Sequence, residues 1–127
     1  MRIPLLFILT MLTLPTPAHA LPSALYGTYS SYRFIPESGD IIGIELVILP
    51  GSPHPNVVFQ CAEGAPGETV FAAATVSGNT LDFVVPSENM CGGRYHVSMA
   101  KGGIRLTGGT AKQQTVLPRH KSYWAPR

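Results

Sequence analysis

The chain has 127 residues, of which 45% are hydrophobic and 13% are charged, and its formal net charge is +2. This length suits one small domain, and the low charge content excludes disorder of the highly charged kind. Thirteen glycines and twelve prolines, spread without a period, exclude collagen-like and long-helix proteins.

Residues 1–20 are typical of a cleavable export signal. Arg2 supplies a positive charge, an apolar run follows from Ile3 to Leu14, and Ala18-His19-Ala20 matches the small-x-small cleavage pattern. The apolar run is shorter than the roughly 20 residues that a membrane-spanning helix needs. We therefore expect a soluble periplasmic or secreted protein without a transmembrane segment in its mature chain, with residues 21–127 forming a single β domain.

The sequence after residue 20 alternates with a period of two, which predicts short strands and no long helix. In chain order, the predicted strands cover residues 26–34, 40–49, 56–62, 69–76, 79–85, 93–99, 103–108 and 113–117. Clusters of Gly, Pro, Ser and Asp separate these runs. Ser77-Gly78 predicts a tight hairpin turn, and Lys101-Gly102-Gly103 predicts a second one.

About eight strands with mostly short links predict an all-β domain. We expect a small antiparallel up-and-down β-barrel, because closure removes exposed sheet edges, and a two-sheet β-sandwich is the alternative. The alternation predicts an inward, core-forming set of residues that favours a packed interior over a ligand cavity. These residues are Ile42, Ile44, Leu46, Ile48, Val57, Phe59, Cys61, Val70, Ala72, Ala74, Val76, Leu81, Phe83, Val85, Tyr95, Val97, Met99, Ile104 and Leu106.

Two cysteines, Cys61 and Cys91, follow the export signal. An even number of cysteines in an oxidising compartment predicts a disulfide, here pinning a loop across one end of the domain. The chain has no Cys-x-x-Cys motif, and the spacing between its cysteines and histidines fits no zinc pattern.

Catalysis has only weak support in the sequence. The chain lacks the nucleophile-elbow, metalloprotease, phosphate-binding and dinucleotide-binding motifs. We expect His54, His96 and His120 to be solvated surface residues. The prediction is a protein that is not an enzyme and that needs no cofactor or metal.

Charge is distributed unevenly along the chain. Residues 21–88 contain all seven acidic residues but only one basic residue, Arg33, whereas residues 89–127 contain seven basic residues and no acid. The favoured interpretation is mutual neutralisation between neighbouring strands. The alternative is a basic C-terminal face for an anionic component of the cell envelope. No motif for specific nucleic-acid recognition accompanies these charges.

Residues 109–127 are predicted to include an extended basic and aromatic C-terminal segment. Several of its residues are of types that are enriched at binding hot spots. The candidate partner-binding residues of this segment are Arg119, Lys121, Tyr123 and Trp124. The favoured interpretation, however, is that Tyr123 and Trp124 dock the segment onto the domain beside Tyr26 and Tyr29.

The start of the predicted mature chain, Leu21-Pro22-Ser23-Ala24 followed by Gly27-Thr28-Tyr29, resembles that of small lipocalin-like bacterial barrels. Among these are the periplasmic inhibitors of secreted metalloproteases, in which a Trp stands at the position of Tyr29. The resemblance implies a small barrel with an N-terminal arm that enters the cleft of the protease. Leu21, Pro22 and Ser23 would then be the contact residues of this arm.

Together these features predict an exported, monomeric, non-catalytic binding protein. Its expected partner is an unidentified protein, and inhibition of a secreted or periplasmic enzyme is the favoured role. The alternatives are a carrier of a small apolar or anionic ligand, and a binder of anionic envelope components through the basic C-terminal face.

Overall fold

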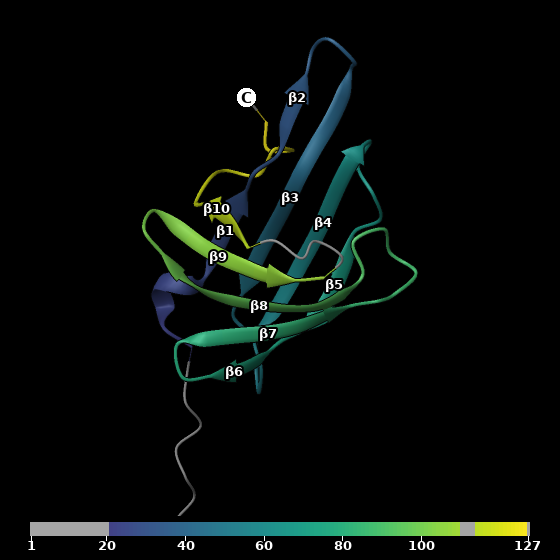
Figure 1. Ribbon diagram of the computed structural model, residues 1–127. Coiled ribbons are helices and arrows are strands. Elements are labelled where there is room, and N and C mark those ends of the chain that lie inside the picture. Colours follow the sequence, from purple (N-terminus) through teal and green to yellow (C-terminus); the bar gives the residue numbers. More distant parts are fainter. Residues whose placement is uncertain (1–20, 110–113, 127) are drawn as a thin grey trace, which may run out of the picture.

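The computed structural model describes residues 21–109 and 114–126, so the predicted export signal lies outside the described residues. Two antiparallel sheets of five strands each face one another (Figure 1), which confirms the all-β prediction. The helical content of the described residues is one 3-10 turn, η1, at Ser23–Leu25. No helix in the described ranges combines the length and the apolar character that crossing a bilayer requires.

The first sheet is built from the N-terminal half of the chain and has the strand order β1-β3-β4-β5, with β2 paired to β3. Its strands are β1 (Gly27–Ser30), β2 (Arg33–Ile35), β3 (Asp40–Leu49), β4 (Asn56–Gly64) and β5 (Val70–Ala73). The long strands β3 and β4 pair from Ile41 opposite Gly64 to Leu49 opposite Asn56. This pair forms the central ladder of the sheet, and the β2–β3 hairpin projects from one end (Figure 1).

The second sheet follows the chain in reverse order, β10-β9-β8-β7-β6. Its strands are β6 (Thr75–Ser77), β7 (Thr80–Val85), β8 (Gly93–Ala100), β9 (Gly103–Gly108) and β10 (Thr115–Pro118). Ser77 pairs with Thr80, so the first predicted hairpin turn lies one residue later than expected. Ala100 pairs with Gly103, which confirms the second turn. The predicted start of the last strand, residue 113, lies outside the described residues.

The two-sheet alternative fits the fold, whereas the closed barrel that the sequence favoured is not confirmed. The strands of the two sheets cross at a steep angle (Figure 1), so the edges approach one another only at corners. At one corner, an isolated bridge joins Tyr29 to Arg119, and the His120 N–H donates to the Thr28 carbonyl at 3.0 Å. At the other corner, the chain passes from β5 to β6 through Ala74.

Two of the predicted strands are each divided into two. The predicted strand 26–34 breaks at Ser31, whose hydroxyl accepts the Ile44 N–H at 3.0 Å. Opposite this break, Gly43 has a φ of +123°, and a Cβ at Gly43 would lie 2.5 Å from the Ser31 carbonyl oxygen. The close approach of the two backbones therefore requires glycine at this position.

The predicted strand 69–76 is divided at Ala74, where the chain leaves the first sheet and enters the second. The Ala74 N–H donates to the Pro55 carbonyl at 2.9 Å, and the side chain is buried. A strand that changes sheets must bend, which interrupts its ladder at this residue. The eight predicted strands therefore become ten.

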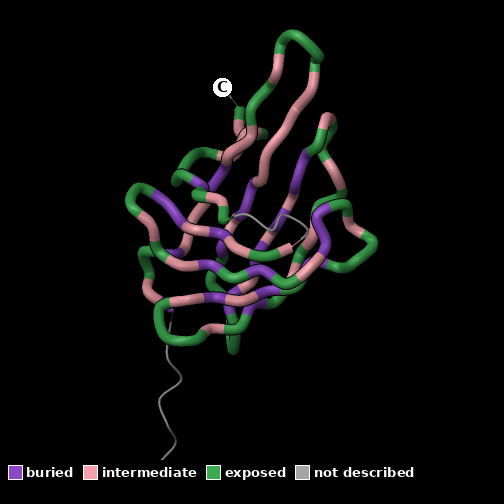
Figure 2. The backbone as a smooth tube through the Cα atoms, viewed as in Figure 1, coloured by how far each residue is buried: buried purple, intermediate pink, exposed green. Residues whose placement is uncertain are grey.

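The core lies between the facing sheets, where the buried positions gather in Figure 2. At its centre, the rings of Phe59, Phe83 and Tyr95 lie 5.0–5.8 Å apart, centroid to centroid. Most of the predicted inward residues are buried, which confirms the alternation. Those residues are Leu46, Ile48, Val57, Phe59, Cys61, Ala74, Leu81, Phe83, Val85, Tyr95, Val97, Ile104 and Leu106. Met99 is 47% exposed because it lies near the end of β8, beside the β8–β9 turn.

The predicted disulfide is present. Cys61 on β4 is bonded to Cys91 in the loop between β7 and β8, with their Cα atoms 6.4 Å apart. Because β4 belongs to the first sheet and the loop leads into the second, the bond joins the two sheets at one end. This is the loop-pinning role that the sequence predicts.

Candidate functional site

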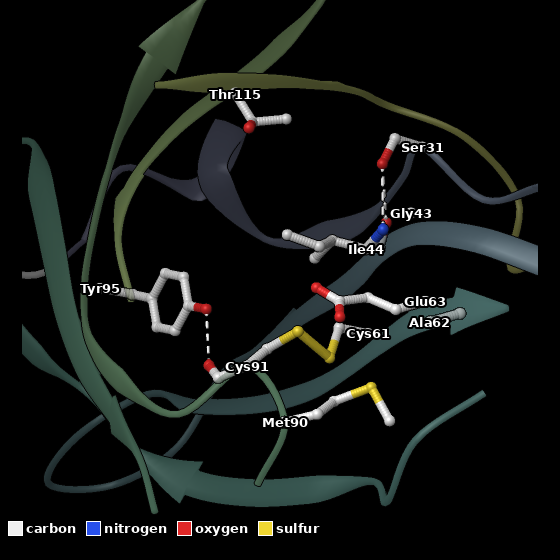
Figure 3. Close-up of a pocket in the computed structure, with 10 residues that line it drawn as sticks. All are labelled: Ser31, Gly43, Ile44, Cys61, Ala62, Glu63, Met90, Cys91, Tyr95 and Thr115. Carbon is white, nitrogen blue, oxygen red and sulfur yellow. Dashed lines mark hydrogen bonds between the residues drawn. A yellow bond between two sulfur atoms is a disulfide. The ribbon is translucent and has the colours of Figure 1, made fainter. Parts of the chain in front are cut away.

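A pocket of about 510 Å³ opens at the end of the molecule that carries the disulfide. It is bounded by β3 and β4 on one side and by β8, β10 and the β7–β8 loop on the other (Figure 3). We call it the disulfide-end pocket. Its lining residues are Ser31, Gly43, Ile44, Cys61, Ala62, Glu63, Met90, Cys91, Tyr95 and Thr115. Its volume is within the range of small-molecule sites, roughly 300–1,000 Å³.

The alternation of β4 explains how an acidic residue reaches this pocket. Phe59, Cys61 and Glu63 occupy every second position and therefore share the face of the sheet that looks toward the core. Phe59 and Cys61 are buried, whereas Glu63, two residues further along, is exposed. In Figure 3, the carboxyl group of Glu63 points into the space among the labelled residues, near Ile44 and the disulfide.

Tyr95 closes the inner side of the pocket. Its ring stacks on Phe83 at 5.3 Å, and its hydroxyl donates to the Cys91 carbonyl at 2.6 Å. Burial raises the pKa of Tyr95, and the Glu63 carboxylate raises it further. Tyr95 is therefore a fixed, neutral wall at ordinary pH.

The β7–β8 loop forms the outer wall and is held by Asn89. The Asn89 side chain accepts the Cys91 N–H at 3.0 Å and donates to the Glu68 carbonyl at 3.1 Å. Met90, which lies between Asn89 and Cys91, adds an exposed thioether to the rim. Because the disulfide and these hydrogen bonds restrain the loop, the pocket is formed before any ligand arrives.

The chemistry of the lining suits non-covalent binding. Aliphatic, aromatic and sulfur groups dominate it, and Glu63 is the one charged residue among the described residues that line it. Within residues 21–109 and 114–126, no group of three or more His, Cys, Asp or Glu side chains is arranged to hold a metal ion. His54, His96 and His120 are exposed, as predicted, and none lines the pocket.

The C-terminal segment, residues 119–126, docks on the outer face of the first sheet through a buried carboxylate. Glu45 on β3 accepts the Ser122 hydroxyl at 2.5 Å and the Tyr123 N–H at 2.7 Å. On the neighbouring strand, Gln60 accepts the indole N–H of Trp124 at 3.0 Å. Glu45 and Gln60 are paired across β3 and β4, so together they provide the docking site.

The predicted docking of Tyr123 and Trp124 is present, but the predicted neighbours were wrong. Both rings pack edge-on against Tyr32, with centroids at 5.6 and 6.2 Å, and not beside Tyr26 and Tyr29. Burial and the nearby Glu45 carboxylate raise the pKa of Tyr32. Trp124 keeps 52% of its surface exposed.

Arg119 connects the end of the chain to its beginning. Its guanidinium donates to the Tyr26 carbonyl at 3.0 Å, to the Tyr29 hydroxyl at 2.8 Å and to the Ala24 carbonyl. It also lies 5.0 Å from the centroid of the Tyr29 ring. These contacts give Arg119 a structural role in the isolated protein, whereas Lys121 is exposed to solvent.

The predicted N-terminal arm packs against the domain. Leu21 is only 5% exposed and belongs to the core cluster. Pro22 is half-buried, and Ser23 is exposed at the start of η1. Of the three predicted arm residues, Ser23 is thus the one that presents its side chain to solvent.

The uneven charge of the sequence becomes a difference between the sheets. The strands of the first sheet carry Arg33, Asp40, Glu45 and Glu63, whereas those of the second carry Asp82, Arg94 and Arg105. Among the described residues, one basic side chain contacts a carboxylate within 4 Å, with His96 Nδ1 and Asp82 Oδ1 hydrogen-bonded at 3.0 Å. In the described part of the chain, no Lys or Arg side chain lies within ion-pair distance of a carboxylate, so direct Lys or Arg pairs do not provide the predicted neutralisation.

Sequence reasoning predicted the Cys61–Cys91 disulfide, which borders the pocket, but predicted neither the pocket nor the place of Glu63 in it. The signal was available, since Glu63 continues the inward phase of Phe59 and Cys61 by one step. Because burial of an unpaired carboxylate is costly, an acidic side chain at an inward position implies that the facing sheet does not extend far enough to cover it.

Comparisons with known protein families, with curated protein sequences and with solved structures found no match. A functional assignment therefore depends on the geometry and chemistry of the sites described above.

Proposed function

We propose that this protein is an exported, non-catalytic binding protein that holds a small, largely apolar ligand in the disulfide-end pocket. The observation that carries the proposal is the pocket itself, with about 510 Å³ of space between a packed aromatic core and the open end of the sheets. Ile44, Tyr95 and the sulfur atoms of Met90 and the disulfide provide apolar contact surface. A site held by a disulfide and hydrogen bonds binds its ligand with little additional ordering.

The pocket supports an apolar ligand better than an anionic one. Within the described part of the chain, Glu63 is the one charged residue of the lining, and a carboxylate repels negative charge. Of the two ligand classes expected from the sequence, the proposal therefore keeps the apolar one.

Export is part of the proposal and is supported by the disulfide, because such bonds persist in oxidising compartments. The test is expression of the full chain in a bacterial host, followed by mass measurement of the protein recovered from the periplasm or the medium. We expect a mature chain that begins at Leu21. Recovery of the uncleaved chain in the cytoplasm would contradict export.

Ligand binding is tested with the neutral fluorescent probe N-phenyl-1-naphthylamine. We expect a saturable increase in fluorescence for the wild type and a loss of this signal in Thr115→Trp, which fills the pocket. The matched control is Val116→Trp, because Val116 neighbours Thr115 on β10 but is 50% exposed outside the lining. Absence of saturable binding, or equal binding by Thr115→Trp, would refute the proposed site.

Inhibition of a secreted enzyme is the second candidate, and the projecting β2–β3 hairpin favours it (Figure 1). Phe34 on β2 is 53% exposed, and a projecting loop with an apolar side chain suits a concave partner such as an enzyme cleft. We expect stoichiometric inhibition of one member of a panel of secreted hydrolases, with Phe34→Ala weakening it at least tenfold. Val84→Ala, at an exposed apolar position of the second sheet, is the control. Inhibition of no enzyme in the panel would remove this candidate.

A further inference from the structure

Glu63 occupies a position that the fold otherwise reserves for apolar side chains. It shares the inward face of β4 with Val57, Phe59 and Cys61, all of which are buried. Its partner across the ladder is Ile42 on β3. A carboxylate among such neighbours is exposed only because it lies at the pocket, where the second sheet no longer covers the first.

The other polar side chains that line the pocket in the described part of the chain are neutral, and two of them are already engaged. The Tyr95 hydroxyl donates to the Cys91 carbonyl, and the Ser31 hydroxyl accepts the Ile44 N–H. Thr115 contributes one further hydroxyl to the lining. Among the lining residues that the structure describes, Glu63 is therefore the strongest polar group to which a ligand can bind.

The charges around Glu63 leave its carboxylate available. Within residues 21–109 and 114–126, no Lys, Arg or His side chain lies within ion-pair distance of Glu63. Ile42 on β3 pairs with Glu63 on one side and with Arg33 on β2 on the other, so the side chains of Arg33 and Glu63 lie on the same face of the sheet, two strands apart. Arg33 is exposed and is not part of the lining. A cation with an apolar body can thus enter beside Ile44 and reach the carboxylate directly.

We infer that the ligand class of the disulfide-end pocket is an apolar amine, with Glu63 as the counter-ion of its ammonium group. The inference depends on the proposed function, because it names the chemistry of the ligand in the same site. The apolar body lies against Ile44, Tyr95 and the disulfide, and the ammonium group donates to the Glu63 carboxylate. Charge-assisted hydrogen bonds of this kind orient a ligand as well as hold it.

The test uses three probes with the same naphthyl-ethyl body: 2-(2-naphthyl)ethylamine, 2-(2-naphthyl)ethanol and 3-(2-naphthyl)propionate. Their affinities are measured at pH 7 by titration of the amide resonances of Ile44, Glu63 and Tyr95. We expect the amine to bind about three- to fivefold more tightly than the alcohol, as for an ion pair partly open to solvent. We expect the propionate to bind most weakly.

Glu63→Gln keeps the shape of the side chain and removes its charge. It should reduce the ratio of amine to alcohol affinity to about one. Glu68→Gln is the matched control, because Glu68 is exposed and lies outside the lining, and it should preserve the ratio. Equal binding of the amine and the alcohol by the wild type, or tighter binding of the propionate, would overturn the inference while the pocket remained a ligand site. Failure of all three probes to move the pocket resonances would overturn both the inference and the proposed function.

Discussion

Reduction of the Cys61–Cys91 disulfide should strongly destabilise the protein. The bond links residues 30 positions apart, and release of a loop of that size costs about 3.6 kcal/mol on the chain-entropy model. That is a large part of the 5–15 kcal/mol by which typical domains are stable. For a domain of about 100 residues it corresponds to a fall in Tm of roughly 15–25 °C.

The assay is thermal unfolding followed by circular dichroism, with and without a phosphine reductant, and with free thiols counted after each treatment. Reduction leaves both sulfur atoms in place, so the fall in Tm reports the cross-link and not the loss of packing. The double variant Cys61→Ala/Cys91→Ala should already melt at a low temperature and should not respond to the reductant. Met90→Ala, at the exposed neighbour of Cys91, should change the free energy of unfolding by less than about 0.5 kcal/mol.

The location of the bond adds a second readout. Because Cys91 tethers the β7–β8 loop to β4, reduction should also weaken binding of the fluorescent probe N-phenyl-1-naphthylamine in the disulfide-end pocket. A fully reduced protein that melts within about 5 °C of the oxidised one would refute the reasoning, since the cross-link would then contribute only about 1 kcal/mol.

Three further predictions concern the core, the C-terminal segment and alkaline pH. Phe83→Ala should lower the free energy of unfolding in urea by about 3–5 kcal/mol, because it empties the aromatic centre of the core. Glu45→Ala should remove the two hydrogen bonds that Glu45 makes with the C-terminal segment, and the emission of Trp124, the only tryptophan of the chain, should shift to the red. Burial holds the pKa values of Tyr29 and Tyr95 above the ordinary 10.0, so the folded state retains protons that the unfolded state loses. The free energy of unfolding should therefore fall as the pH rises above about 10, and Tyr95→Phe should flatten this fall. An unshifted emission maximum in Glu45→Ala, or a pH profile that is flat to pH 11, would contradict the respective prediction.

Local alternation determined most of the strands and the core. Whether a side chain faces inward depends on the phase of its own strand, and that phase can be read from a few consecutive residues. Leu46, Phe59, Leu81 and Val97 are all buried where the period of two places them. The disulfide was predictable for a similar reason, because two cysteines allow one pairing.

Breaks within strands depended on contacts between segments that are distant in the sequence. Ser31 leaves the ladder because it meets Gly43 and Ile44 on another strand, and the chain bends at Ala74 because the next strand joins the other sheet. Neither residue carries a strong turn signal. The choice between barrel and sandwich depended on the same bends, because they set the angle at which the two sheets cross.

The amino-acid sequence by itself determined the all-β class, the inward residues and the covalent link, because each follows from the periodicity or from the presence of a residue pair. Only the tertiary structure decided that Glu63 borders a pocket and that Tyr123 and Trp124 pack against Tyr32. Both outcomes depend on how far one sheet extends past the other and on where the end of the chain finds hydrogen-bond partners. Both the extent of each sheet and the partners of the chain end depend on many contacts between residues distant in the sequence, and no single segment of the chain specifies them.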